Sequence, residues 1–95
     1  MNIKDLHPAA KGISAISLFK GEEGMVKTIH LSAGVELTKH QSKTNALLLC
    51  IDGEVVFEND NGVKETLKQG DYVNIEPLVD HWMSSVTDSY LILMK

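Results

Sequence analysis

The chain has 95 residues, a length that holds one domain and leaves no room for a second. Its formal net charge is −4 and its nine Lys and Arg residues are scattered, which excludes the clustered basic surface that nucleic acid requires. No apolar run is long enough to span a bilayer. The sequence therefore predicts a single domain whose partners include neither nucleic acid nor a membrane.

The N-terminal residues carry no signal-peptide core and no lipidation motif. The one cysteine, Cys50, lies in an apolar run and can form no intrachain disulfide. A lone thiol suits a reducing compartment, so we expect a cytoplasmic protein. Residues 1–12, which include Pro8, Ala9 and Ala10, are expected to form an N-terminal segment with at most one helical turn, and residues 13–95 to form one barrel.

Short runs rich in Val, Ile, Leu, Tyr and Phe alternate with Gly, Asp and Asn turns, which is typical of an all-β protein. No stretch has the periodicity of a long amphipathic helix. Many short antiparallel strands at regular spacing predict a sandwich or a barrel. The expected strands are Ser14–Lys20, Met25–Leu31, Val35–Lys39, Asn45–Ile51, Glu54–Glu58, Val63–Leu67, Tyr72–Ile75, His81–Ser85 and Tyr90–Met94.

Two dipeptides, Asp52-Gly53 and Asn61-Gly62, each separate two apolar runs. Both suit the type I′ turn of a two-residue hairpin, which needs a positive φ at both central positions. The sequence therefore predicts a tight hairpin at each of them.

The strand Asn45–Ile51 is apolar on both faces, because successive side chains of a strand point to opposite sides. The outside of an isolated barrel should be polar, so we expect a second sheet or a second subunit to cover it, and we favour a homodimer. One face carries Ala46, Leu48 and Cys50, and the other carries Leu47, Leu49 and Ile51.

The four histidines have different surroundings. His7 lies in the N-terminal segment and is expected to be solvated. His30 alternates with two apolar residues in a strand, so it should face outward as a surface or interface residue. His40 and His81 each adjoin a loop beside a strand, which favours a role in a site.

The segment around His40 resembles the first motif of the cupin family, which has the form G-x5-H-x-H-x3/4-E-x6-G. Gly34, His40 and Gly53 stand at its glycine and first-histidine positions, while Ser42 and Ala46 stand at its second-histidine and glutamate positions.

The segment around His81 resembles the second cupin motif. A Gly-Asp turn, a short strand, a proline and a histidine follow one another in that motif, as Gly70, Asp71, Pro77 and His81 do here. The resemblance covers residues 25 to about 94. It implies the cupin barrel, a double-stranded β-helix of the jelly-roll kind.

In a typical cupin the histidines and the glutamate of the two motifs hold a divalent metal ion. The resemblance leaves only His40 and His81 as ligands of a zinc, nickel, iron or manganese ion, whereas open metal sites need about three protein ligands. Glu36 is the candidate replacement carboxylate, because it shares the parity of His40 if the strand is straight. Cys50 is expected to lie too deep.

The alternative is a polar pair in an apolar pocket, the usual design of a small-molecule site. Two neighbouring imidazoles disfavour each other's protonation and suit an anion when charged. A purely structural pair that fills the barrel mouth also stays open. Trp82 should point away from the interior as a packing or interface residue. The expected pocket residues are His40, Ser42, Ala46, Leu48, His81 and Met83.

Three functions follow as hypotheses. The first is a small-molecule-binding cupin that is non-enzymatic or weakly catalytic. The second is a metal-dependent isomerase or dioxygenase acting on a small acid or sugar derivative. The third is a dimeric interaction or regulatory module that uses its apolar outer strand face.

Overall fold

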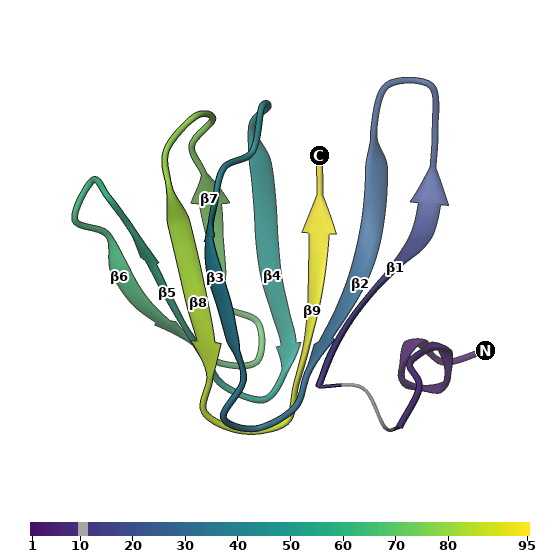
Figure 1. The fold of residues 1–95 in the computed structure, drawn as a ribbon. Helices are drawn as coiled ribbons and strands as arrows, with labels where there is room; N and C mark the ends of the chain where they lie inside the picture. Colours follow the sequence, from purple (N-terminus) through teal and green to yellow (C-terminus); the bar gives the residue numbers. More distant parts are fainter. Residues whose placement is uncertain (10–11) are drawn as a thin grey trace.

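A computed structural model describes residues 1–9 and 12–95, which form an all-β fold as predicted (Figure 1). A short 3-10 helix, η1 (Ile3–Leu6), precedes the strands, in keeping with the single predicted turn; Ala10 lies outside the described residues. No bound of a predicted strand differs from the observed one by more than one residue. The strands are β1 (Ile13–Lys20), β2 (Met25–Leu31), β3 (Glu36–His40), β4 (Ala46–Asp52), β5 (Val55–Asn59), β6 (Lys64–Leu67), β7 (Tyr72–Ile75), β8 (His81–Ser85) and β9 (Ser89–Met94).

Two antiparallel sheets face each other (Figure 1). One has five strands in the order β1-β2-β9-β4-β7, and the other has four in the order β3-β8-β5-β6. Most paired strands are distant in sequence, as in β2 with β9 and β3 with β8. Within the described residues, no helix has the length and the apolar character that crossing a membrane requires.

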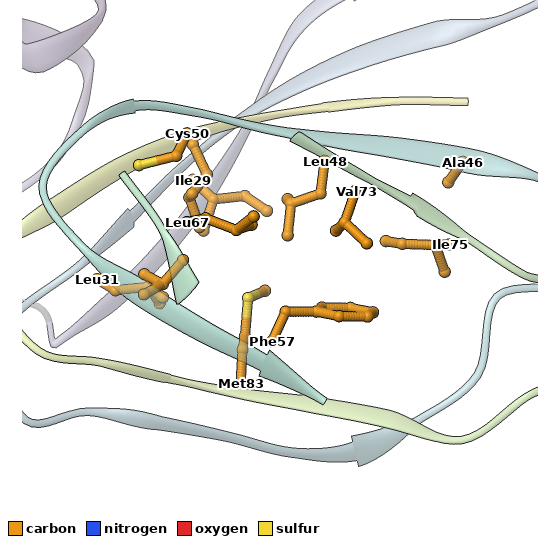
Figure 2. Close-up of a cluster of buried hydrophobic side chains, with 12 residues drawn as sticks. Ile29, Leu31, Ala46, Leu48, Cys50, Phe57, Leu67, Val73, Ile75 and Met83 are labelled. Carbon is orange, nitrogen blue, oxygen red and sulfur yellow. The ribbon is translucent and has the colours of Figure 1, made fainter. Parts of the chain in front are cut away.

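The core lies between the two sheets and follows from strand alternation (Figure 2). In β4 the inward residues Ala46, Leu48 and Cys50 are buried, while the residues between them are half-buried on the outer face. Phe57 of β5 and Met83 of β8 extend from the opposite sheet toward them (Figure 2). The apolar residues on the inward face of β4 therefore join the core as the alternation predicts.

The hairpin prediction for Asp52-Gly53 is wrong. The strands on either side, β4 and β5, belong to different sheets and do not pair, so this turn carries the chain across the barrel. Gly53 has a φ of 93°, but Asp52 is not among the described residues with positive φ, as a type I′ turn would require.

Asn61-Gly62 does connect a hairpin, β5–β6, but its turn is not type I′. Of the two residues only Gly62 has a positive φ, of 85°. The Gly62 amide donates to the Asn59 carbonyl at 3.2 Å, and the Asn59 amide donates to the Val63 carbonyl at 3.0 Å. This is a three-residue loop that ends on a left-handed glycine, the second common way to close a hairpin.

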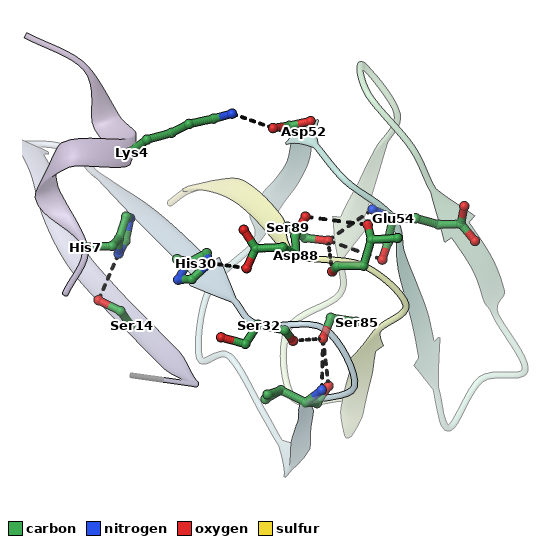
Figure 3. Close-up of polar contacts among 12 residues, drawn as sticks. Lys4, His7, Ser14, His30, Ser32, Asp52, Glu54, Ser85, Asp88 and Ser89 are labelled. Carbon is green, nitrogen blue, oxygen red and sulfur yellow. Dashed lines mark hydrogen bonds and ion pairs between the residues drawn. The ribbon is translucent and has the colours of Figure 1, made fainter. Parts of the chain in front are cut away.

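The N-terminal segment is fastened to the outer face of the five-stranded sheet by His7, so the prediction that His7 is solvated is wrong (Figure 3). Its Nδ1 lies 2.8 Å from Ser14 Oγ and its Nε2 lies 3.1 Å from Thr28 Oγ1. Burial, and secondarily His30, lower the pKa of His7. Lys4 adds an ion pair of 2.6 Å with Asp52.

His30 faces outward as predicted, but the N-terminal segment buries it to 6% exposure. Its Nε2 donates to Asp88 Oδ1 at 2.6 Å (Figure 3). Its ring stacks on Tyr90 with centroids 4.6 Å apart. A face that the strand pattern marks as outer is thus locally interior, because a segment distant in sequence lies over it.

Candidate functional site

A cavity of about 100 Å³ lies between the sheets, at the end where β3 finishes and β8 begins. Figure 1 shows that this end also holds the β3–β4 loop and the C-terminal end of β9. The wall of the cavity is mostly apolar, and its polar members come from the mouth.

All six residues expected in the pocket from the sequence line this one cavity: His40, Ser42, Ala46, Leu48, His81 and Met83. Five of them come from strands of both sheets, in agreement with the strand alternation, and Ser42 comes from the β3–β4 loop. Whether a ligand binds there stays a prediction.

The structure places Glu36 on the outer surface, away from the cavity. The register of β3 against β8 shifts between Leu37 and His40, because β3 carries one extra residue there. Such a bulge reverses the parity beyond it, so Leu37 and His40 both line the cavity while Glu36 pairs with the outward Ser84. The argument that placed Glu36 beside His40 assumed a straight strand, and that assumption is wrong.

His40 and His81 meet at the mouth of the cavity. Their Nε2 atoms lie 3.0 Å apart and their rings are edge to face, with centroids 4.2 Å apart. The Nδ1 of His40 lies 2.9 Å from the Thr38 carbonyl oxygen, which can only accept, so Nδ1 carries a proton. In neutral His40 the Nε2 is then an acceptor, and the Nε2–H of His81 donates to it.

His81 is the buried member of the pair, with 3% exposure, and Phe57 stacks on it at 5.6 Å. Its Nδ1 has no hydrogen-bond partner among the described residues. Burial, and after it the neighbouring His40, lower the pKa of His81 below its ordinary value. Both effects favour the neutral form of His81, which suits a hydrogen-bonding group in this site.

The residues of the site do not fit a tightly held metal ion. Among the described residues no group of three or more His, Cys, Asp and Glu side chains could hold one. The hydroxyl of Ser42 donates to the Thr44 carbonyl at 2.7 Å, and Ala46 offers no donor atom. Cys50 is fully buried away from the cavity lining, and burial raises the pKa of its thiol. Two imidazoles are short of the three protein ligands that an open site needs.

Sequence reasoning missed several lining residues. Gln41 and Lys95 supply polar groups at the mouth, and Gln41 donates its amide to Asp80 Oδ1 at 2.8 Å. The apolar ones could have been found by carrying the strand alternation across the sheets, but nothing local in the sequence places Lys95 beside His40. The missed apolar residues are Ile29, Leu37, Ile75 and Leu93.

No protein-family model and no curated protein sequence matches the chain. Its structure is nevertheless similar to solved structures. An RmlC-like cupin from Shewanella frigidimarina is 26% identical over 92% of this chain and 78% of that one, with a TM-score of 0.80. A cupin superfamily protein from Desulfitobacterium hafniense is 14% identical over 100% of this chain and 87% of that one, with a TM-score of 0.85.

The chain has the cupin fold. A third structure, an RmlC-like cupin from Methanocaldococcus jannaschii with a double-stranded β-helix fold, is 21% identical over 94% of this chain and 84% of its own, with a TM-score of 0.78. These similarities confirm the predicted fold class and the resemblance to cupins. A cupin barrel hosts many chemistries, so the function has to be argued from the cavity.

Proposed function

We propose that this cupin domain binds a small organic molecule in the cavity between its sheets, without catalysis or with weak catalysis. The observation that carries the proposal is the composition of the cavity: an apolar wall with a hydrogen-bonded histidine pair at its mouth. Few convergent polar groups in a concave apolar site are the usual features of a ligand pocket. The lone, buried thiol of Cys50 supports placing the protein in the reducing cytoplasm.

The size of the cavity limits the ligand. An engineered cavity of about 150 Å³ accepts benzene, so a cavity of about 100 Å³ suits a group of about four or five non-hydrogen atoms. A larger ligand would extend out past His40, which is exposed at the rim. The fitting probes are therefore short-chain molecules such as butanamide.

Butanamide is expected to shift the NMR signals of Leu48 and Met83 in the wild-type protein, because both side chains line the cavity. Ala46→Leu should abolish this response, since the added carbon atoms would occupy the space. Ala15→Leu is the matched control, because Ala15 is exposed on β1. An unchanged response in Ala46→Leu, or no response in the wild type, would contradict the proposal. His81→Ala should weaken binding.

A metal-dependent isomerase or dioxygenase is the second candidate. Its support is the 3.0 Å between the two Nε2 atoms, a spacing that neighbouring nitrogens at about 2.0–2.1 Å from one ion can adopt. It has less support than binding, because the described residues supply no third ligand. About one equivalent of divalent ion in protein purified without chelator, lost in His40→Ala and His81→Ala, would favour it.

We also propose that the domain forms a homodimer through the outer face of its five-stranded sheet. The strand registers place two adjacent rows of side chains across all five strands of this face, and neither row contains a charged residue. We call these rows the outer patch. The first row is Ile16, Thr28, Ile92, Leu49 and Tyr72, and the second is Phe19, Val26, Met94, Leu47 and Asn74. His7 of the N-terminal segment covers Thr28, so this one position contributes no exposed surface to the patch.

A second copy is the occupant that the outer patch fits best. Five strands about 4.8 Å apart make the patch about 24 Å wide, comparable to one side of an interface of about 800 Å² per partner. The two rows cover only part of that area, so the interface has to extend onto neighbouring residues of the same face. Phe19 and Tyr72 are 64% and 58% exposed at its two ends. Strand β1 also has a free edge beside the patch, which a twofold-related copy can cover.

Light scattering during gel filtration should give twice the chain mass of 10.5 kDa. Leu49→Lys is expected to give a monomer, because it buries a charge inside the outer patch, next to its central strand β9. Val56→Lys is the control, since Val56 is half-buried and pairs with the outward Ser84 on the other sheet. A monomeric wild type would contradict the dimer and favour an interaction module that uses this face for another protein.

A further inference from the structure

A lysine-lined depression adjoins the cavity, with Lys95 lining both. Lys20 and Lys43 also line this depression. The three residues come from the end of β1, the β3–β4 loop and the end of β9, so only the fold brings them together. We infer that the ligand is a small organic anion whose apolar part occupies the cavity and whose charged group lies at the mouth of the cavity. The inference rests on the proposed binding function.

The balance of charged side chains at the mouth favours an anionic ligand. None of the side chains that line the cavity is acidic, and Glu22 is the one acidic side chain among the described residues that line the depression. Asp80, beside the mouth, accepts the amide of Gln41. A chain with a net charge of −4 therefore presents a locally basic site.

Lys20, Lys43 and Lys95, the mouth lysines, form no ion pair with any residue that the structure describes. In the described residues, the ion pairs that are formed use Lys4, His30 and Lys39. Lys39 lies over the Trp82 ring and 3.6 Å from an Asp60 oxygen, so its charge is already compensated on another face. Lys20, Lys43 and Lys95 are exposed and are left to attract a ligand.

The orientation of the ligand follows from the cost of burying charge. The inner wall, which includes Leu48 and Met83, offers no polar partner, so a charged group placed there would lose its hydration without compensation. At the mouth the group keeps water and gains the attraction of nearby ammonium groups. A short apolar chain with a terminal carboxylate meets both requirements, because its chain lies against the inner wall and its charge lies at the mouth.

Butanoate, butanamide and butylammonium test the inference, because they have similar apolar chains and differ in charge. In NMR titrations at low salt, butanoate should bind at least about fivefold more tightly than butanamide, and butylammonium should bind most weakly. Added sodium chloride should weaken only butanoate strongly. The double variant Lys43→Gln/Lys95→Gln should bring butanoate to the affinity of butanamide, and Lys64→Gln/Lys68→Gln, on the β6 side, should not.

The outcomes separate the inference from the function on which it rests. The inference that the ligand is an anion would be overturned by equal affinities of butanoate and butanamide. A butanoate affinity that Lys43→Gln/Lys95→Gln leaves unchanged would also overturn it. Either result would still leave the cavity as a binding site. If no probe of any charge shifts the Leu48 signals, the proposed binding function itself fails. All four lysines are exposed, so loss of folding does not confuse the comparison.

Discussion

Phe57→Ala is expected to lower the free energy of unfolding by about 3–5 kcal/mol, the usual cost of truncating a buried aromatic side chain. Phe57 has no exposed surface and lies between the two sheets (Figure 2). Its ring stacks on His81. Its removal would leave a void that the opposite sheet cannot fill. For a domain with a typical total stability of about 5–15 kcal/mol, this is a large share.

Urea unfolding followed by Trp82 fluorescence measures the effect. Phe57→Leu is the graded control, because it keeps most of the volume and should cost about 1.5 kcal/mol or less. Val86→Ala, at a position that is 52% exposed, should change stability by less than about 0.5 kcal/mol. A loss in Phe57→Ala no larger than that in Phe57→Leu would show that the ring is not a main packing element.

Gly53→Ala is expected to destabilise the fold by about 2–5 kcal/mol, from backbone strain and steric overlap together. Gly53 has a φ of 93°, which side chains rarely tolerate. A Cβ at this position would lie 2.5 Å from the Asp88 carbonyl oxygen and 2.7 Å from Ser89 Cα, and it would overlap Ser89 Oγ. The crossing between the sheets leaves no room for it.

Gly62→Ala separates the two causes, because Gly62 has a similar φ of 85° but open space around its missing side chain. Gly62→Ala should therefore lower the free energy of unfolding by about 1–2 kcal/mol, the cost of backbone strain alone. Urea denaturation of both variants gives the difference directly. Equal losses at the two glycines would mean that the β4–β5 crossing relaxes to admit a side chain.

Local sequence patterns were enough to predict the strands and the inward faces of β4 and β8. The alternation of apolar side chains acts through nearest neighbours and is visible in a single sequence. The same alternation, with the spacing of the two motifs, brought His40 and His81 into one predicted pocket, and the structure places them 3.0 Å apart.

The failures came from features that no local pattern contains. A single extra residue in β3 turns Glu36 outward. The turn at Gly53 looks like a hairpin because its residues suit one, yet pairing with β9 and β7 takes β4 into the other sheet. His7 and Lys95 acquire their surroundings from residues far away in the chain. Each case depends on which strands become neighbours, and that is decided by the whole fold.

Strand β9 has a consequence for biosynthesis. It is the last strand of the chain, yet it lies at the centre of the five-stranded sheet, between β2 and β4. A ribosome delivers residues from the N-terminus onward, so β2 and β4 emerge long before the strand that joins them. Until β9 arrives both edges are open, and open edges invite pairing with other chains. The larger sheet can therefore close only after synthesis has reached Met94, and until then β1 with β2 and β4 with β7 stand as separate parts of it.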